Sequence, residues 1–181
     1  MSDTDQFESF VREHQDKVYA TAWRILGNEA DARDVAQEAF VRAWHHWADV
    51  SRGGPGGAWV KTVARNLAIN ILQRHRARWS NFTDLAPDDP DGPSFESTLS
   101  VAETQLDRVL NVEQREVLGQ AIAQLPPDQR AALVLYHYED MDYAEIAAQM
   151  GASLGKVKTD IHRARRALFK RLQPLREDMG C

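Results

Sequence analysis

Residues 125–172 read LPPDQRAALVLYHYEDMDYAEIAAQMGASLGKVKTDIHRARRALFKRL, and the punctuation of this stretch decides the fold. Pro126 and Pro127 end one helix and begin another, because proline lacks an amide hydrogen for a helix interior but fits a first turn. A short helical pattern at 143–150 ends at Gly151, the residue type preferred in a left-handed C-terminal cap. The stretch therefore predicts a short helix, a tight turn and a second helix.

The second helix of this pair has one apolar stripe, and the rest of its surface is mostly cationic. Ser153 can cap its N-terminus. Apolar residues then recur three or four positions apart, as expected for a buried face: Leu154, Val157, Ile161, Ala164, Leu168 and Leu172. Residues 156–176 contain one acid, Asp160, and eight bases: Lys156, Lys158, Arg163, Arg165, Arg166, Lys170, Arg171 and Arg176. A solvated surface helix can carry such charge.

The spacing around the turn favours DNA binding over a solvated surface helix. Ala147 is small where two helices must cross closely, and Gly151 follows four residues later. Val157 anchors the second helix six residues after the glycine. These intervals are typical of a helix-turn-helix, which presents its second helix to the DNA major groove.

The formal net charge of −5 is divided unevenly along the chain. Residues 1–50 carry ten acids and five bases, whereas residues 61–79 carry five bases and no acid. Because a mean charge hides patches of opposite sign, two basic helices in an acidic protein suit contact with DNA at two places. The acidic part suits a basic protein partner, although acidic surfaces also serve solubility alone.

Several classes of protein are excluded by what the sequence lacks. Cys181 is the only cysteine, which rules out an intrachain disulfide and a cysteine-rich zinc site and fits a reducing cytosol. His45 and His46 point about 100° apart on a helix and cannot readily chelate one metal. Neither a phosphate loop nor a nucleophile constellation occurs, nor a signal peptide or membrane span. We expect a cytoplasmic protein without enzymatic activity, metal or cofactor, and not inserted in a membrane.

The first 80 residues predict a helical bundle with one acidic and one basic helix. Helical periodicity covers 3–26, 29–47 and 58–79, and Gly27 is expected to end the first of these helices. Opposite its apolar stripe, the second of these helices carries Asp31, Asp34, Gln37 and Glu38, a pattern that is most often simply solvated. The third exposes Lys61, Arg65, Asn66, Asn70 and Arg74. Trp59 near its start could be packed or could stack on unpaired bases, so the helix suggests a single-stranded ligand.

Two segments are expected to lie outside regular structure. Residues 51–57, SRGGPGG, predict a mobile or sharply turned loop between two helices. Residues 81–111 contain a cluster of proline and aspartate, with six acids and no base between 84 and 103, and predict an acidic flexible linker. A solvated spacer is the plainer interpretation of those acids. Helical periodicity resumes at 112 and begins a second domain, 112–181.

The motifs resemble two conserved regions of the bacterial sigma factors of the extracytoplasmic-function (ECF) group. Residues 31–44 (DARDVAQEAFVRAW) and 58–68 (AWVKTVARNLA) resemble region two. The resemblance to region four rests on residues 125–130, 143–147, 155–158 and 162–165. The resemblance covers nearly the whole chain, in order. It implies an all-α fold of two small domains, the region-two bundle at 1–80 and the region-four helix-turn-helix at 112–181, joined by an extended linker at 81–111.

The resemblance implies a sigma factor that directs RNA polymerase core to specific promoters and promotes DNA melting. Core binding, at the clamp helices of the largest subunit, falls to Asp34, Gln37 and Glu38. Loop 53–57 would capture a flipped base of the minus-ten element. The residues that would recognise and melt this element are Trp59, Lys61, Arg65, Asn66, Asn70 and Arg74. Recognition of the minus-thirty-five duplex falls to Ser153, Lys156, Lys158, Thr159, His162, Arg163 and Arg166. Contact with the polymerase flap and control by an anti-sigma factor are also implied.

The chain departs from the family pattern at Asp160, where a base is common. Its carboxylate could accept a hydrogen bond from a cytosine amino group or could pair with a neighbouring arginine. The main rival function is a helix-turn-helix transcription regulator that binds duplex DNA without polymerase, with the N-terminal half serving dimerisation or ligand binding.

Overall fold

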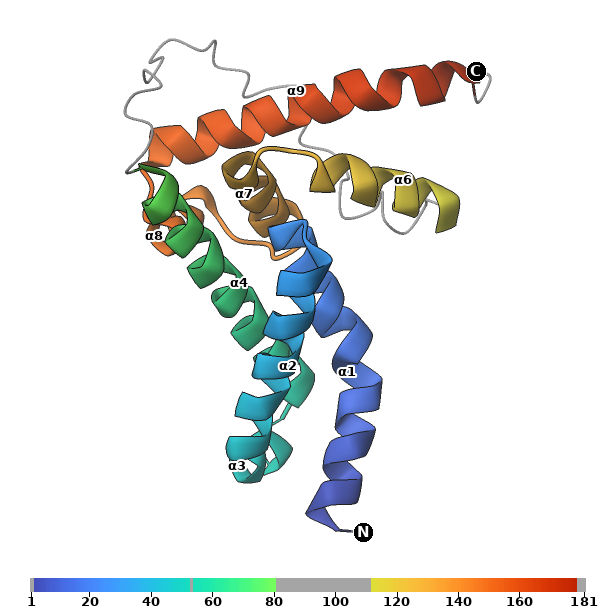
Figure 1. Ribbon diagram of the computed structural model, residues 1–181, viewed down its shortest axis with the longest axis vertical. Helices are drawn as coiled ribbons and strands as arrows, with labels where there is room; N and C mark the ends of the chain where they lie inside the picture. Colours follow the sequence, from blue (N-terminus) through green and yellow to red (C-terminus); the bar gives the residue numbers. More distant parts are fainter. Residues whose placement is uncertain (1, 53, 81–111, 179–181) are drawn as a thin grey trace. The chain divides into compact units, whose positions relative to one another are not determined.

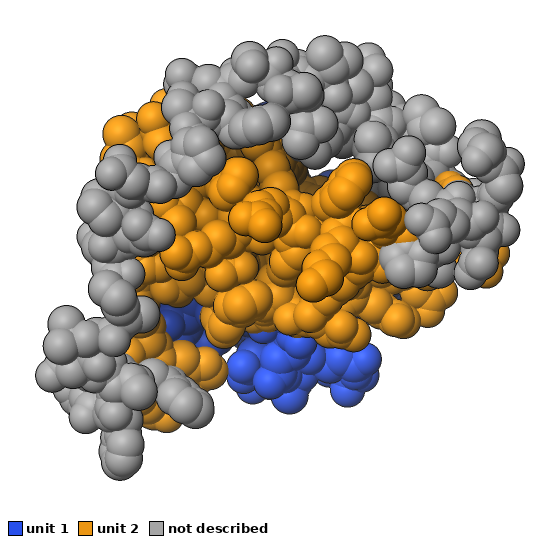
Figure 2. Space-filling model, turned by 90° about the horizontal axis from the view of Figure 1, so that it is seen from above, with its two compact units in different colours: residues 1–74 blue, residues 75–181 orange. Residues whose placement is uncertain are grey.

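The computed structural model describes residues 2–52, 54–80 and 112–178, which form eight helices and no strand (Figure 1). The helices are α1 (Asp3–Leu26), α2 (Glu29–His45), α3 (Trp47–Arg52), α4 (Gly56–Ser80), α6 (Val112–Ala123), α7 (Pro127–His137), α8 (Tyr143–Met150) and α9 (Leu154–Asp178). The chain divides into two compact units, Met1–Arg74 and His75–Cys181 (Figure 2). The prediction of an all-α, two-domain fold is confirmed. The predicted linker at 81–111 lies outside the described residues.

Several helix ends follow the local signals in the sequence. α1 begins at a capping box formed by Ser2 and Asp5 and ends at Gly27, whose φ of 64° is left-handed. α8 begins at an Asp142 capping box and ends at Gly151, with φ of 61°. Both glycine caps were predicted and are confirmed, because glycine adopts this conformation without a side-chain clash. Among the described helices, none has the length and apolarity needed to cross a membrane.

The first unit is built on the packing of α1 against α2. Its buried core is rich in alanine and valine: Val18, Ala22 and Ile25 of α1, Ala32, Val35, Ala39 and Ala43 of α2, and Val60, Ala64 and Ala68 of α4. Short side chains let neighbouring helices approach closely. The predicted apolar stripe of α2 is confirmed at its four buried residues, and the polar residues of that helix are consequently left on its outer side. The prediction is wrong at Trp44, which was expected in the stripe but is 43% exposed.

The glycine-rich segment contains less loop than predicted. Arg52 is the last residue of α3, and Gly56 is already the first residue of α4. The prediction that 51–57 excludes regular structure is therefore wrong at both ends of the segment. Sequence patterns missed this because glycine and proline are read as helix breakers, although both are tolerated near helix ends.

Two of these glycines are required by close packing. A Cβ atom on Gly57 would lie 2.5 Å from Cε1 of His14, and one on Gly56 would lie 2.9 Å from Cγ1 of Val50. Such distances are shorter than side chains tolerate, so a larger residue would displace the neighbours. The first turn of α4 can therefore approach α1 and α3 only because it lacks side chains.

The second unit is organised around α9, which packs against α6, α7 and α8. Its core includes Leu135 of α7, Ile146 of α8, and Val157 and Ile161 of α9, all nearly inaccessible to solvent. The predicted stripe of α9 is confirmed at these two positions and at Ala164. It is wrong at Leu154, which is 47% exposed. As the first residue of α9, Leu154 points back past the end of the helix, where no preceding turn lies.

Arg130 is a buried cation that holds α6 to α7. Its side chain is almost inaccessible, and Nη1 donates to the carbonyl oxygens of Ala123 at 3.0 Å and Leu125 at 3.1 Å. These carbonyls lie at the C-terminal end of α6, where the last helical carbonyls have no partner within the helix. Burial lowers the pKa of the Arg130 guanidinium from its usual value. The residue is therefore a structural cap.

We expect Arg130→Met to lower the free energy of opening of α6 by about 2 to 3 kcal/mol, because two carbonyls lose a charged donor. Amide hydrogen exchange of peptides from α6 measures this opening within the full chain. The matched control is Arg166→Met, since Arg166 is an exposed arginine of the same unit; it should change the opening free energy by less than about 0.5 kcal/mol. Equal exchange in the two variants would contradict the capping role.

Candidate nucleic-acid and partner interfaces

The acidic side of α2 is open to solvent. Asp34, Gln37 and Glu38 are all exposed, and they lie within one turn of one another. Oε1 of Glu38 accepts a hydrogen bond from Nε of Arg42 at 2.8 Å. Both side chains of this pair are about half exposed, at 48% and 50%, so solvent screens the pair and a partner could replace it. The predicted core-binding residues thus form one accessible surface.

An apolar patch continues this acidic surface toward the C-terminal end of α2. Val41 and Trp44 are each 43% exposed. The ring of Trp44 lies 4.9 Å from that of Phe7, so one side of the indole is packed and the other is accessible. Exposed apolar side chains beside a charged surface are typical of protein interfaces. The acidic side of α2 is therefore suited to a protein partner.

The predicted minus-ten residues of α4 divide into a stripe and a flank. Trp59, Asn66, Asn70 and Arg74 are exposed. They are separated by seven, four and four residues, so they lie along one side of the helix. Lys61 and Arg65 are half-buried and lie four residues apart on a different side of the helix. The exposed stripe combines an aromatic ring, two amides and a guanidinium, which can stack on a base, hydrogen-bond its edge and neutralise a phosphate.

Two hollows lie beside the start of α4. The larger has a volume of about 640 Å³, and its lining includes Phe10, His14, Trp47, Gly54, Pro55, Gly56, Gly57 and Lys61. The smaller, of about 300 Å³, is lined by His46, Asp49, Val50, Pro55, Gly56 and Trp59. The rings of His46 and Trp59 are 6.0 Å apart. Both volumes fall within the range of small-ligand sites, and the glycine-rich segment borders both.

The outer side of α9 presents most of the predicted minus-thirty-five residues. Lys158, His162, Arg163 and Arg166 are exposed, and Thr159 is half-buried. Lys158 and Thr159 lie four residues before His162 and Arg163, respectively. Arg166 follows Arg163 by three residues. These intervals place the five residues on adjoining parts of the helix surface. A helix with this arrangement can insert cations and hydrogen-bond donors into a major groove.

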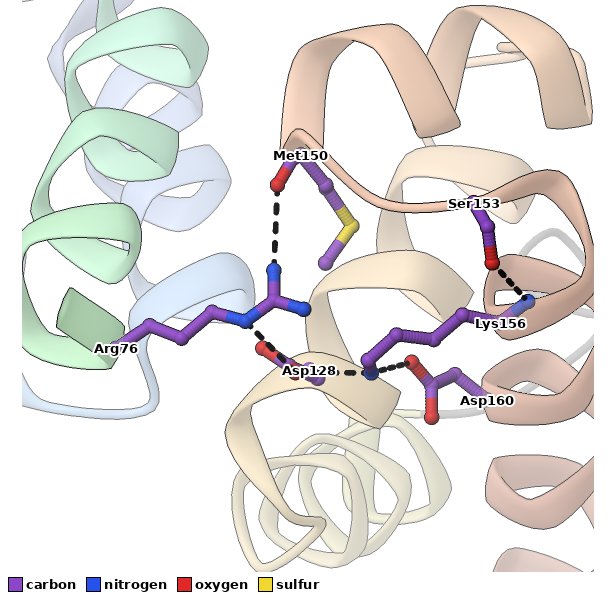
Figure 3. Close-up of polar contacts among 6 residues, drawn as sticks. All are labelled: Arg76, Asp128, Met150, Ser153, Lys156 and Asp160. Carbon is purple, nitrogen blue, oxygen red and sulfur yellow. Dashed lines mark hydrogen bonds and ion pairs between the residues drawn. The ribbon is translucent and has the colours of Figure 1, made fainter. Parts of the chain in front are cut away.

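Lys156 differs from the other predicted contacts because two acids hold it (Figure 3). Its ammonium lies 2.9 Å from Oδ2 of Asp128 and 2.5 Å from Oδ2 of Asp160. Burial alone would lower the pKa of Lys156, but the hydrogen bonds and charges of the two carboxylates outweigh it and raise that pKa. Ser153, predicted as both cap and DNA contact, accepts a hydrogen bond from the amide of Lys156 at 3.1 Å and caps α9.

The same contacts show which group the Asp160 carboxylate pairs with. Asp160 is only 6% exposed. Among the described residues, its side chain pairs with Lys156, one helical turn earlier. The partner is therefore a lysine and not the arginine that the sequence suggested. The side chain of Asp160 is 9% exposed, which leaves little of the carboxylate accessible to a base.

The opposite flank of α9 is held by aromatic rings. Nζ of Lys158 lies 5.7 Å from the ring centre of Tyr143, and the guanidinium carbon of Arg165 lies 5.5 Å from that of Tyr136. The two tyrosine rings are stacked at 5.0 Å. Cations attract the faces of aromatic rings, so this column ties α9 to α7 and α8. The described residues contain no group of three or more His, Cys, Asp or Glu placed to hold a metal ion.

Some accessible residues on these surfaces were not predicted. Thr62 lies on the stripe of α4, three residues after Trp59. Phe169 of α9 is 62% exposed and lies seven residues after His162, which places it on the same side of the helix. Val41 likewise lies seven residues after Asp34. Helical spacing from the polar candidates was the signal that could have identified them.

Comparison with known proteins finds similarity over both units. Residues 10–78 match the family model described as sigma-70 region 2, and residues 115–168 match sigma-70, region 4. The chain is 32% identical over 175 residues to the ECF RNA polymerase sigma factor SigW of Bacillus subtilis, covering 96% of this chain and 92% of that protein. It is 36% identical over 166 residues to the ECF RNA polymerase sigma factor SigL of Mycobacterium tuberculosis, covering 90% and 86%. A solved structure of the sigma factor RpoE of Bartonella quintana, in complex with the anti-sigma factor NepR, aligns with 22% identity and a TM-score of 0.48 over 93% and 97% of the two chains.

Proposed function

We propose that separate surfaces of this chain, which belongs to the extracytoplasmic-function group of the sigma-70 family of RNA polymerase sigma factors, bind the polymerase core and the two promoter elements. As a member of that family, it directs RNA polymerase core to specific promoters. The observation that carries this function is the presence of regions 2 and 4 in one chain, in that order. A helix-turn-helix regulator acting without polymerase would account for the second match and leave the first unexplained.

The acidic side of α2 binds the core enzyme in this proposal. Asp34, Gln37 and Glu38 face a basic surface on the clamp helices of the largest subunit, and Val41 and Trp44 add apolar contact. The exposure of all five residues supports this assignment. Charge complementarity of this kind steers association and fixes the register of the partners.

The stripe of α4 recognises and opens the minus-ten element. Trp59, Asn66, Asn70 and Arg74 contact the melted strand, with Lys61 and Arg65 contributing from the flank. The hollows beside the glycine-rich segment support capture of an unstacked base, since a preformed pocket offsets part of the cost of flipping it.

The outer side of α9 reads the minus-thirty-five duplex. Its contacts are Lys158, Thr159, His162, Arg163 and Arg166, with Ser153 presenting the capped start of the helix to the backbone of the DNA. Lys156 receives no DNA contact here, because Asp128 and Asp160 hold it. We assign region two to residues 1–80, the linker to 81–111 and region four to 112–181. Contact with the flap, control by an anti-sigma factor and action in the cytoplasm complete the proposal.

Transcription in vitro tests the function directly. RNA polymerase core, this protein and sheared genomic DNA of the source organism are combined, and the 5′ ends of the transcripts are sequenced. We expect transcripts to start downstream of a small set of sites with shared minus-thirty-five and minus-ten sequences, because both regions constrain the promoter. Core alone is the control. Binding to duplex DNA without core, combined with no core-dependent transcripts, would favour the rival regulator.

We expect Glu38→Lys to weaken core binding by about tenfold at low salt, with a smaller effect at high salt where charges are screened. Fluorescence anisotropy of the labelled full chain with core measures this affinity. Glu29→Lys is the matched control, because Glu29 also pairs with an arginine four residues later, at 3.3 Å, and lies on the opposite side of α2. Equal weakening in both variants would remove Glu38 from the interface.

We expect Asn66→Ala to slow promoter opening by about tenfold, the effect of one lost hydrogen bond to a base, while duplex binding stays close to that of the wild type. Permanganate footprinting follows opening, and a premelted template should restore activity. His75→Ala serves as control, since His75 is exposed on the opposite side of α4. Failure of Asn66→Ala on the premelted template would show that the residue has no role in melting.

A further inference from the structure

We propose that Lys156 is a positioning residue of the recognition helix and not a DNA contact: Asp128 and Asp160 hold its ammonium and so fix the start of α9 against α7. The inference rests on the proposed reading of the minus-thirty-five element by α9. It concerns Lys156, which the sequence places among the predicted DNA contacts, and Asp160, which departs from the family pattern.

The contacts join the first turns of two helices. Lys156 is the third residue of α9, and Asp128 is the second residue of α7. The distance from Nζ of Lys156 to Oδ2 of Asp128 is 2.9 Å, and Asp160 holds the same ammonium from one turn further along α9 (Figure 3). A lysine side chain between two carboxylates therefore sets where α9 begins relative to α7.

Burial makes this arrangement hard to exchange for a phosphate contact. The side chain of Asp160 is 9% exposed, whereas those of Lys156 and Asp128 are 32% and 31% exposed. If Lys156 turned toward DNA, it would leave the buried carboxylate of Asp160 without its cation, which is far more costly than losing a pair on the surface. Burial lowers the pKa of the ammonium, but the two acids more than reverse this and raise the pKa, so Lys156 stays charged in place.

The surroundings of α9 show that the fold separates bases that hold the helix from bases that face solvent. Arg165, which is half-buried, lies over Tyr136 on the other flank. Arg166, by contrast, is exposed on the outer side. The charge that α9 offers to DNA is therefore smaller than its composition suggests, and Asp160 neither reads a base nor repels a phosphate.

The salt dependence of DNA binding distinguishes a held lysine from a DNA-contacting one. Holoenzyme is reconstituted from core and the full chain, and its affinity for the strongest promoter found by transcript sequencing is measured from about 50 to about 200 mM salt. Loss of one cation that neutralises a phosphate makes the slope of log K against log salt shallower by about 0.9. Removing Lys156 alone would strand the buried acid and could unfold the unit, so the informative variant is the double substitution Lys156→Met with Asp160→Leu.

We expect the double variant to keep the wild-type slope, while Arg166→Met, the matched control on the outer side, makes the slope shallower by about 0.9. A slope equally shallow in the double variant would overturn the proposal, because Lys156 would then contact a phosphate. If wild-type holoenzyme ignored the minus-thirty-five sequence altogether, the proposed function of α9 would fail instead, and the two failures are thus distinct.

Base preference provides the second readout. Holoenzyme carrying Asp160→Asn is offered promoter duplexes with a randomised minus-thirty-five element, and bound sequences are counted. We expect the preferred bases of the wild type with affinity reduced severalfold at every sequence, and Lys156→Arg, which keeps the charge, should retain most of the affinity. A change of preference at one base pair would overturn the proposal, since it would make Asp160 a reader.

Discussion

The structure of the second unit depends on how one helix accommodates its excess of positive charge. α9 must bury a stripe of apolar residues and still present cations to a nucleic acid. The fold meets both demands by placing groups that attract cations along the edges of the buried stripe: two carboxylates on one flank and the faces of two stacked tyrosine rings on the other. These contacts orient the helix, and the exposed bases are left on the outer side.

The first unit meets a related constraint with small side chains. Alanine at three buried positions of α2 and glycine at the start of α4 let the helices approach closely, so their polar residues are forced outward. Acids gather on α2, and amides and bases gather on α4. The two surfaces consequently differ in chemistry, one suited to a basic protein and the other to unpaired nucleic acid.

Formal charge is a poor measure of what each surface offers a partner. Glu38 is paired with Arg42 in an exposed position, where a basic partner can compete for the carboxylate. Lys156 is paired in a partly buried position with two acids, where a phosphate competes poorly. The Glu38–Arg42 and Lys156–Asp128 pairs have similar distances, 2.8 and 2.9 Å, but solvent access decides whether a charge is available for binding.

The sequence by itself determined the helical class, the two-domain organisation, the glycine caps at Gly27 and Gly151, and the family. These follow from local patterns, since periodicity, caps and motifs involve residues within a few turns of one another. Only the tertiary structure decided that α4 begins within the glycine run, that Arg130 caps another helix, and that Lys156 is held. The partner of Lys156 on α7 lies 28 residues away along the chain. Such contacts depend on how the helices pack, and no local pattern of charge or spacing specifies them.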